Sequence, residues 1–147
     1  MSNFYSDRLL DIIYYHDVVP VINQLEAHVF AQRFEEKAIM DEHKILMQAW
    51  SPLARGEQNI FNHEVLGPIG AKYNKTSAQI ALKYLVQNGI SVVPKTVNKE
   101  RMKQNIDLFD FELSDEDLAQ VRKLDGTFRF TDHRDPEVTK SIMDRRF

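Results

Sequence analysis

Three short apolar runs constrain the fold of this chain more than any other feature. They are residues 18–24 (VVPVINQ), 45–49 (ILMQA) and 90–94 (ISVVP). Each is continuously apolar, whereas a strand with one solvated face alternates apolar and polar residues. Segments with helical periodicity separate the runs, and such alternation is typical of a parallel sheet covered by helices. The sequence therefore predicts an α/β fold with three parallel strands, or four if residues 1–3 form the stub of another.

The segments between these runs carry recognisable helix signals. Helices are expected at about residues 6–16, 32–42, 62–73, 76–88, 98–105 and 115–124. Thr76 is followed by Gln79 at the spacing of a capping box. Ser6, Asn98 and Ser114 are good candidates for the N-caps of three other helices. Residues 128–147 are expected to form an irregular tail.

Composition limits the classes of function. The chain has 147 residues, the size of one ordinary domain, and no linker or domain boundary is visible. Its 19 basic and 22 acidic residues leave a net charge of −3, which argues against nucleic acid as a partner. Cysteine is absent, which suits a cytoplasmic protein, and no apolar run reaches the roughly 18 residues of a membrane span. The five histidines lack metal-ligand spacing, so no metal site is predicted.

The third apolar run leads into a candidate phosphate site. Pro94 ends the expected strand, Lys95 and Thr96 follow in a loop, and Asn98 begins a helix that carries Arg101. A lysine, a hydroxyl group, a helix N-terminus and an arginine thus meet at the carboxyl end of a strand, as in many phosphate sites. Local chemistry alone favours the alternative, an ordinary βα turn with surface charges.

Several motifs resemble those of the aldo-keto reductase family, in the family's order. They are SNF (residues 2–4), VINQLEAH (21–28), AWSPLARG (49–56), TSAQIALKYLVQNG (76–89), VPKTVNKERMKQN (93–105), FELSDED (111–117) and DHRDPE (132–137). The family fold is a (β/α)8 barrel of the TIM type, and this chain resembles only its C-terminal half. Residues 1–147 are therefore expected to form a single partial domain, with residues 126–147 as the C-terminal tail.

The resemblance implies NADP(H) as cofactor. It assigns the nicotinamide carboxamide to Ser2, Asn3 and Gln24, and the face of the nicotinamide ring to Trp50, where the family more often has tyrosine. Contacts along the pyrophosphate are implied for Ser51, Leu53 and Arg55. The remaining implied residues would hold the adenosine 2′-phosphate (Lys95, Thr96, Val97 and Arg101) and the adenine (Gln104 and Asn105).

The family reduces carbonyl groups with a tyrosine, lysine, aspartate and histidine from the first barrel strands, and those strands have no counterpart here. No catalytic residue is therefore predicted. Methionine commonly precedes SNF inside intact relatives, so Met1 resembles an internal residue, and the chain is expected to need a missing N-terminal half.

Three readings of function follow. The chain is the cofactor-binding half of a reductase of aldehydes or ketones, inactive alone, or a non-catalytic NADP(H)-binding module, or a vestigial fragment. In each, exposed sheet edges predict self-association or pairing with a missing half. The tail, with Phe128, Phe130 and residues 132–137, is expected either to shape substrate choice in an intact barrel or to be solvated.

Overall fold

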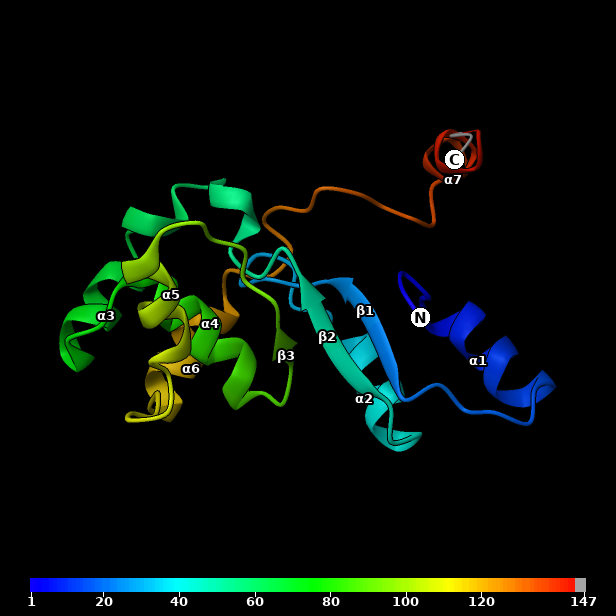
Figure 1. The fold of residues 1–147 in the computed structure, drawn as a ribbon, viewed down its shortest axis with the longest axis horizontal. Coiled ribbons are helices and arrows are strands. Elements are labelled where there is room, and N and C mark those ends of the chain that lie inside the picture. The colour runs from blue at the N-terminus through cyan, green and yellow to red at the C-terminus, as the bar shows by residue number, and fades with distance from the viewer. Residues whose placement is uncertain (145–147) are drawn as a thin grey trace.

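A computed structural model describes residues 1–144 of the chain (Figure 1). A three-stranded parallel sheet lies at its centre, with helices on either side along the long axis. The elements in chain order are α1 (Ser6–Tyr15), β1 (Ile22–Glu26), α2 (Phe34–Glu42), β2 (Leu46–Trp50), the 3-10 turns η1 (Ala54–Gly56) and η2 (Ile60–Asn62), α3 (Leu66–Tyr73), α4 (Ser77–Gln87), β3 (Ser91–Val92), α5 (Lys99–Ile106), α6 (Asp115–Arg122) and α7 (Pro136–Met143).

The sheet has the order β1-β2-β3, and all of its strands run in parallel. Residues 1–3 extend it beyond β1, because the N–H of Asn3 donates to the Gln24 carbonyl at 2.9 Å and the N–H of Gln24 donates to the Met1 carbonyl at 3.0 Å. The prediction of three to four parallel strands is thus confirmed. The first strand begins four residues later than expected, because only the last of residues 18–21 meets the neighbouring strand: the N–H of Leu46 donates to the Val21 carbonyl at 2.8 Å.

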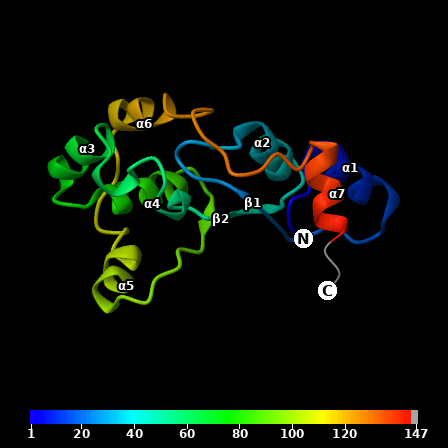
Figure 2. The same cartoon turned by 90° about the horizontal axis from the view of Figure 1, so that it is seen from above.

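One face of the sheet is buried beneath helices. Leu25, Met47 and Ala49 point to this face and are almost fully buried, and α4 contributes Ile80 and Tyr84 to the same core. The opposite face carries Gln24 and Gln48 and is partly open. Figure 2 shows α2 on one side of β1 and β2, and α3, α5 and α6 grouped with α4 at one end of the molecule.

Most of the predicted helix starts are confirmed. Thr76 and Gln79 form the capping box of α4, Asn98 caps α5 and Ser114 caps α6. Ser6 is not a cap, because it is already the first helical residue and Tyr5 occupies the N-cap position without a side-chain hydrogen bond. The helix expected from residue 62 begins instead at Leu66.

The prediction of an irregular tail over residues 128–147 is wrong for part of its length. Asp135 accepts a hydrogen bond from the N–H of Glu137 at 2.9 Å, and Pro136 occupies the first turn of α7. Both are strong helix-start signals. The last three residues of the predicted tail lie outside the described part of the chain. The tail runs from α6 to α7, which lies at the same end of the molecule as the N-terminus (Figures 1 and 2).

Candidate functional site

Three neighbouring cavities follow the carboxyl ends of the strands, with volumes of about 510, 420 and 220 Å³. Their linings overlap. Arg55 lines the first and second cavities, whereas Leu53, Phe61, Lys95 and Arg101 line both the second and the third. The three cavities therefore lie next to one another in a row from the Trp50 end of the sheet to the start of α5, and this row is called the channel below. Eleven of the thirteen residues predicted to bind the cofactor line this channel: Ser2, Asn3, Trp50, Ser51, Leu53, Arg55, Lys95, Thr96, Arg101, Gln104 and Asn105.

The end near α5 carries two free cations. Lys95 and Arg101 are exposed at the 220 Å³ cavity, and within residues 1–144 neither forms an ion pair. The Arg101 guanidinium lies 5.9 Å from the centre of the Phe61 ring, which restricts where it can point. Two cations without partners in one concave site favour an anionic ligand.

The N-terminus of α5 is less available to a phosphate than the sequence suggested. The Asn98 side chain accepts hydrogen bonds from the N–H groups of Glu100 at 2.9 Å and Arg101 at 3.1 Å. The Thr96 hydroxyl in turn accepts from the N–H of Asn98 at 3.1 Å. These bonds hold the loop in a defined shape but use two of the first free N–H groups of the helix. An anion here therefore relies mainly on the side chains of Lys95 and Arg101.

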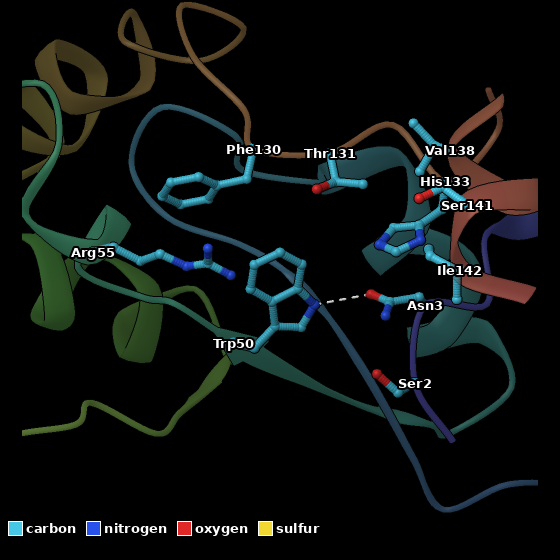
Figure 3. Close-up of a pocket in the computed structure, with 10 residues that line it drawn as sticks. All are labelled: Ser2, Asn3, Trp50, Arg55, Phe130, Thr131, His133, Val138, Ser141 and Ile142. Atoms are coloured by element: carbon cyan, nitrogen blue, oxygen red, sulfur yellow. Dashed lines mark hydrogen bonds between the residues drawn. The ribbon is translucent and has the colours of Figure 1, made fainter. Parts of the chain in front are cut away.

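At the other end, Trp50 forms a flat, half-buried wall (Figure 3). Its indole N–H donates to Oδ1 of Asn3 at 2.9 Å, which fixes the ring plane. The Phe130 ring lies 6.4 Å from the indole, centre to centre and nearly parallel, and the Arg55 guanidinium lies 4.4 Å from the Phe130 ring centre. Figure 3 shows Arg55 directed toward both aromatic rings. This end can hold a planar group beside hydrogen-bonding partners.

The channel is lined by strained backbone. Asn3, Ser51 and Arg55 have φ angles of 59°, 52° and 51°, in the left-handed region that residues other than glycine rarely adopt. Nε of Arg55 donates to the Ser51 hydroxyl at 3.2 Å, which ties the two strained residues together. Such conformations cost free energy and concentrate at binding sites. Ser51 and Arg55 belong to the loop after β2, and Asn3 belongs to the segment before α1, so the strained residues of the channel come from two segments.

Two predicted residues lie outside the three cavities. The Gln24 side chain donates to Oε1 of Gln48 at 2.7 Å, and Gln48 donates to the Ser91 hydroxyl at 3.4 Å, so these amides form a polar row across the open face of the sheet. The Val97 side chain is 85% exposed to solvent. The positions of these two side chains therefore do not support a role for either residue in contacting a ligand.

Other residues of the site were not predicted from the sequence. Phe61, Thr76 and Ala78 line the cavity near α5, and Thr131, Val138 and Ile142 line the one near Trp50. The sequence pattern around Thr76 predicts only its role as the N-cap of α4 and does not indicate that it also lines the cavity. The tail residues reach the channel only through the path of the chain after α6, which no local pattern reveals.

Sequence comparison assigns the chain to a family, because the profile of the Aldo/keto reductase family matches residues 1–126. The chain belongs to the aldo/keto reductase family. It is 38% identical over 125 residues to the methylglyoxal reductase DkgA of Escherichia coli K12, covering 85% of this chain and 46% of that protein. It is 35% identical over 129 residues to aldose reductase C of Dictyostelium discoideum, covering 88% of this chain and 40% of that protein.

Solved aldo-keto reductases have the same fold as the chain. An aldo-keto reductase from a Medee basin deep-sea metagenome, MGS-M4, aligns with a TM-score of 0.86 at 30% identity, over 92% of this chain and 51% of that one. The silkworm (Bombyx mori) aldo-keto reductase AKR2E5 complexed with NADPH aligns with a TM-score of 0.81 at 32% identity, over 87% of this chain and 42% of that one. The chain thus spans about half the length of the relatives it matches, and the predicted half-barrel fold is confirmed.

Residues 1–144 contain neither a metal site nor a membrane-spanning helix. No cluster of three or more histidine, aspartate or glutamate side chains is arranged to hold a metal ion there. In the same part of the chain, every helix is too short or too polar to cross a membrane.

Proposed function

We propose that this chain is the NADP(H)-binding half of a reductase that converts aldehydes or ketones to alcohols, and that it is inactive alone. The observation that carries the proposal is a pair of cations, Lys95 and Arg101, that find no ion-pair partner among residues 1–144. They lie at one end of a channel whose other end is the flat wall of Trp50. NADP(H) has the matching layout, with a 2′-phosphate at one end and a planar ring at the other. Family membership supports the same cofactor, since related structures were solved with NADPH.

Each end of the channel has a defined part in this proposal. When bound, NADPH supplies the hydride that reduces a carbonyl carbon. Lys95 and Arg101 neutralise the 2′-phosphate, which selects NADPH over NADH. Trp50 offers the ring a broad apolar face, and Asn3 orients the indole through its amide oxygen. Arg55 stands between the two ends and can meet the pyrophosphate charge.

A fluorescence titration with NADPH and NADH tests the phosphate site. We expect the chain to bind NADPH more tightly than NADH. Replacing both cations (Lys95→Ala with Arg101→Ala) should weaken NADPH binding by at least about tenfold and abolish the preference, because each charge-assisted bond contributes about 1.5–3 kcal/mol.

The matched control replaces two cations on the same helix that do not line the channel, Lys99→Ala with Lys103→Ala. It removes the same charge and should keep the preference for NADPH. Equal binding of both dinucleotides by the unmodified chain would contradict the proposed cofactor. Turnover of a simple aldehyde by the chain alone would contradict the proposed inactivity.

We also propose that the isolated chain associates with a second copy of itself through the open face of its sheet. Ile22 and Leu46 face each other across β1 and β2 on this face, and their side chains are 37% and 43% exposed. In an intact barrel such a face would be covered by further strands and their side chains. The alternative partner for this face is the N-terminal half of the barrel, supplied as a separate chain.

A further inference from the structure

Glu26 is a buried carboxylate at the end of β1 that the proposed cofactor site does not use. Its side chain has no exposure to solvent. A charged group in such a place is stable only when hydrogen bonds replace its lost hydration. The partners of Glu26 therefore indicate what the residue does.

The first partner is His28, which is equally buried. Nδ1 of His28 accepts the N–H of Phe30 at 3.3 Å, so the ring proton must lie on Nε2. Nε2 then donates to Oε1 of Glu26 at 3.2 Å. The imidazole is held among the rings of Phe30, Phe128 and Phe130, each centred 5.9 Å away.

The other partners belong to the tail, more than 100 residues further along the chain. The backbone N–H of Phe130 donates to Oε1 of Glu26 at 2.6 Å, and that of Thr131 donates to Oε2 at 3.2 Å. Burial raises the pKa of Glu26, but the hydrogen bonds from His28, Phe130 and Thr131 outweigh it and keep the pKa below its usual value. The carboxylate is thus ionised and its two oxygens share three donors.

This contact ties the backbone of Phe130 to the end of β1. With its backbone bound to Glu26, the Phe130 ring packs beside Trp50 and under the Arg55 guanidinium, at the planar end of the channel (Figure 3). Beyond residue 131 the tail continues to α7, which closes the side of the same cavity with Val138 and Ile142. One buried carboxylate therefore connects the end of β1 to the wall of the candidate site.

We propose that Glu26 is a positioning residue that latches the tail, so that Phe130 and α7 form the outer wall of the Trp50 end of the channel. The latch acts through backbone N–H groups, so it fixes the path of the tail whatever side chains the tail carries. Its bearing on substrate choice rests on the proposed function, but the latch itself does not.

Energy transfer from Trp50 to a label on α7 measures the latch. Trp50 is the only tryptophan and the chain has no cysteine, so Met143→Cys, at a side chain that is 74% exposed, gives a single labelling site. In this background, Glu26→Gln keeps the size and shape of the side chain but removes its charge. The amide N–H₂ of the glutamine then faces a backbone N–H of the tail, so one of the tail's hydrogen bonds is lost. We expect the ratio of molecules with the tail bound at residue 26 to molecules with the tail released to fall at least about tenfold. The measurement records this change as a loss of energy transfer.

The control is Glu35→Gln, which removes the same charge from an exposed position on α2 and should leave energy transfer unchanged. Circular dichroism reports whether each variant is folded. If folded Glu26→Gln keeps full energy transfer, the latch is overturned. If that variant does not fold, Thr131→Pro decides in the same way, because it removes one tail donor and leaves the Glu26–His28 pair in place.

Binding of adenosine 2′,5′-bisphosphate separates this inference from the proposed function. The compound probes only the Lys95 end, so we expect Glu26→Gln to bind it as tightly as the unmodified chain. If the unmodified chain fails to bind it, the proposed cofactor site is wrong, while energy transfer still decides the latch.

Discussion

Gln32 shows how a single buried amide can join distant segments. Its Nε2 donates to the Val29 carbonyl at 2.7 Å and to the Val121 carbonyl at 3.0 Å, and its Oε1 accepts the Tyr84 hydroxyl at 2.7 Å. The loop after β1, the end of α6 and the centre of α4 thus meet at one side chain. Every polar atom of this amide is paired, as a buried polar group requires.

Tyr84→Phe should destabilise the fold by about 1–3 kcal/mol, because it leaves the buried oxygen of Gln32 without its donor while keeping the ring packing. Urea unfolding followed by circular dichroism measures this loss. Tyr14→Phe is the matched control, since Tyr14 is 75% exposed, and it should change stability by less than about 0.5 kcal/mol. Equal stability of the two variants would show that the Gln32 bond contributes nothing.

At the scale of elements, α3 is shaped by the close approach of a turn. A side chain at Gly70 would bring its Cβ within 2.4 Å of the Lys75 carbonyl oxygen, whereas the nearest atom to a Cβ at Gly67 is 3.8 Å away. The N–H of Lys75 also donates to the Gly70 carbonyl at 2.9 Å, which holds the turn into α4 against the helix. Only glycine fits at residue 70.

The two glycines therefore predict opposite effects of the same substitution. Gly70→Ala should cost about 1–3 kcal/mol through overpacking against backbone. Gly67→Ala, in the same helix, should be neutral or stabilise by up to about 1 kcal/mol, because alanine favours the helical state. Thermal unfolding of both variants tests this, and a Gly70→Ala variant as stable as Gly67→Ala would refute the steric argument.

Elements with local signals could be predicted, and those set by distant contacts could not. The caps at Thr76, Asn98 and Ser114 depend on bonds within three residues, so the sequence contains all the information. The start of β1 depends on pairing with β2 and with residues 1–3, which apolar content alone does not specify. For α7 the signal was present, as Asp135 followed by Pro136, but the surrounding charges masked it.

The same distinction applies to the candidate site. Residues that the motifs assigned to one cofactor, such as Ser51, Leu53 and Lys95, lie together at the cavities, because their short segments directly follow neighbouring strands. Their role in binding stays a prediction. Glu26 stood within one of these motifs, yet its partners Phe130 and Thr131 lie 104 and 105 residues away. No pattern in the sequence connects positions so far apart.

The whole molecule is a sheet with one covered and one open face. On the open face Gln24, Gln48 and Ser91 pair with each other, while Ile22 and Leu46 remain partly exposed next to them. The three polar side chains are linked by two hydrogen bonds, whereas Ile22 and Leu46 expose apolar surface that a second copy of the chain would bury. Association of the isolated chain is the expected result.

Light scattering should find the chain as a dimer or larger species at micromolar concentration. Leu46→Lys should shift it toward monomer, because burying a lysine on this face is costly. Val18→Lys serves as the control, since Val18 is 78% exposed but precedes the sheet, and it should leave the association unchanged. A monodisperse monomer for the unmodified chain would rule out the proposed interface.

Helix α4 is enclosed on nearly every side, with eight of its eleven residues buried, whereas α7 has none buried. In hydrogen exchange this contrast separates two kinds of motion. Amide protons of α4 can reach solvent only when the whole structure opens, while those of α7 exchange through local fraying. Lys95 follows β3, which packs against α4, whereas the wall beside Trp50 includes α7. Slow exchange is therefore expected in the core behind the Lys95 loop, and fast exchange in the helix beside Trp50.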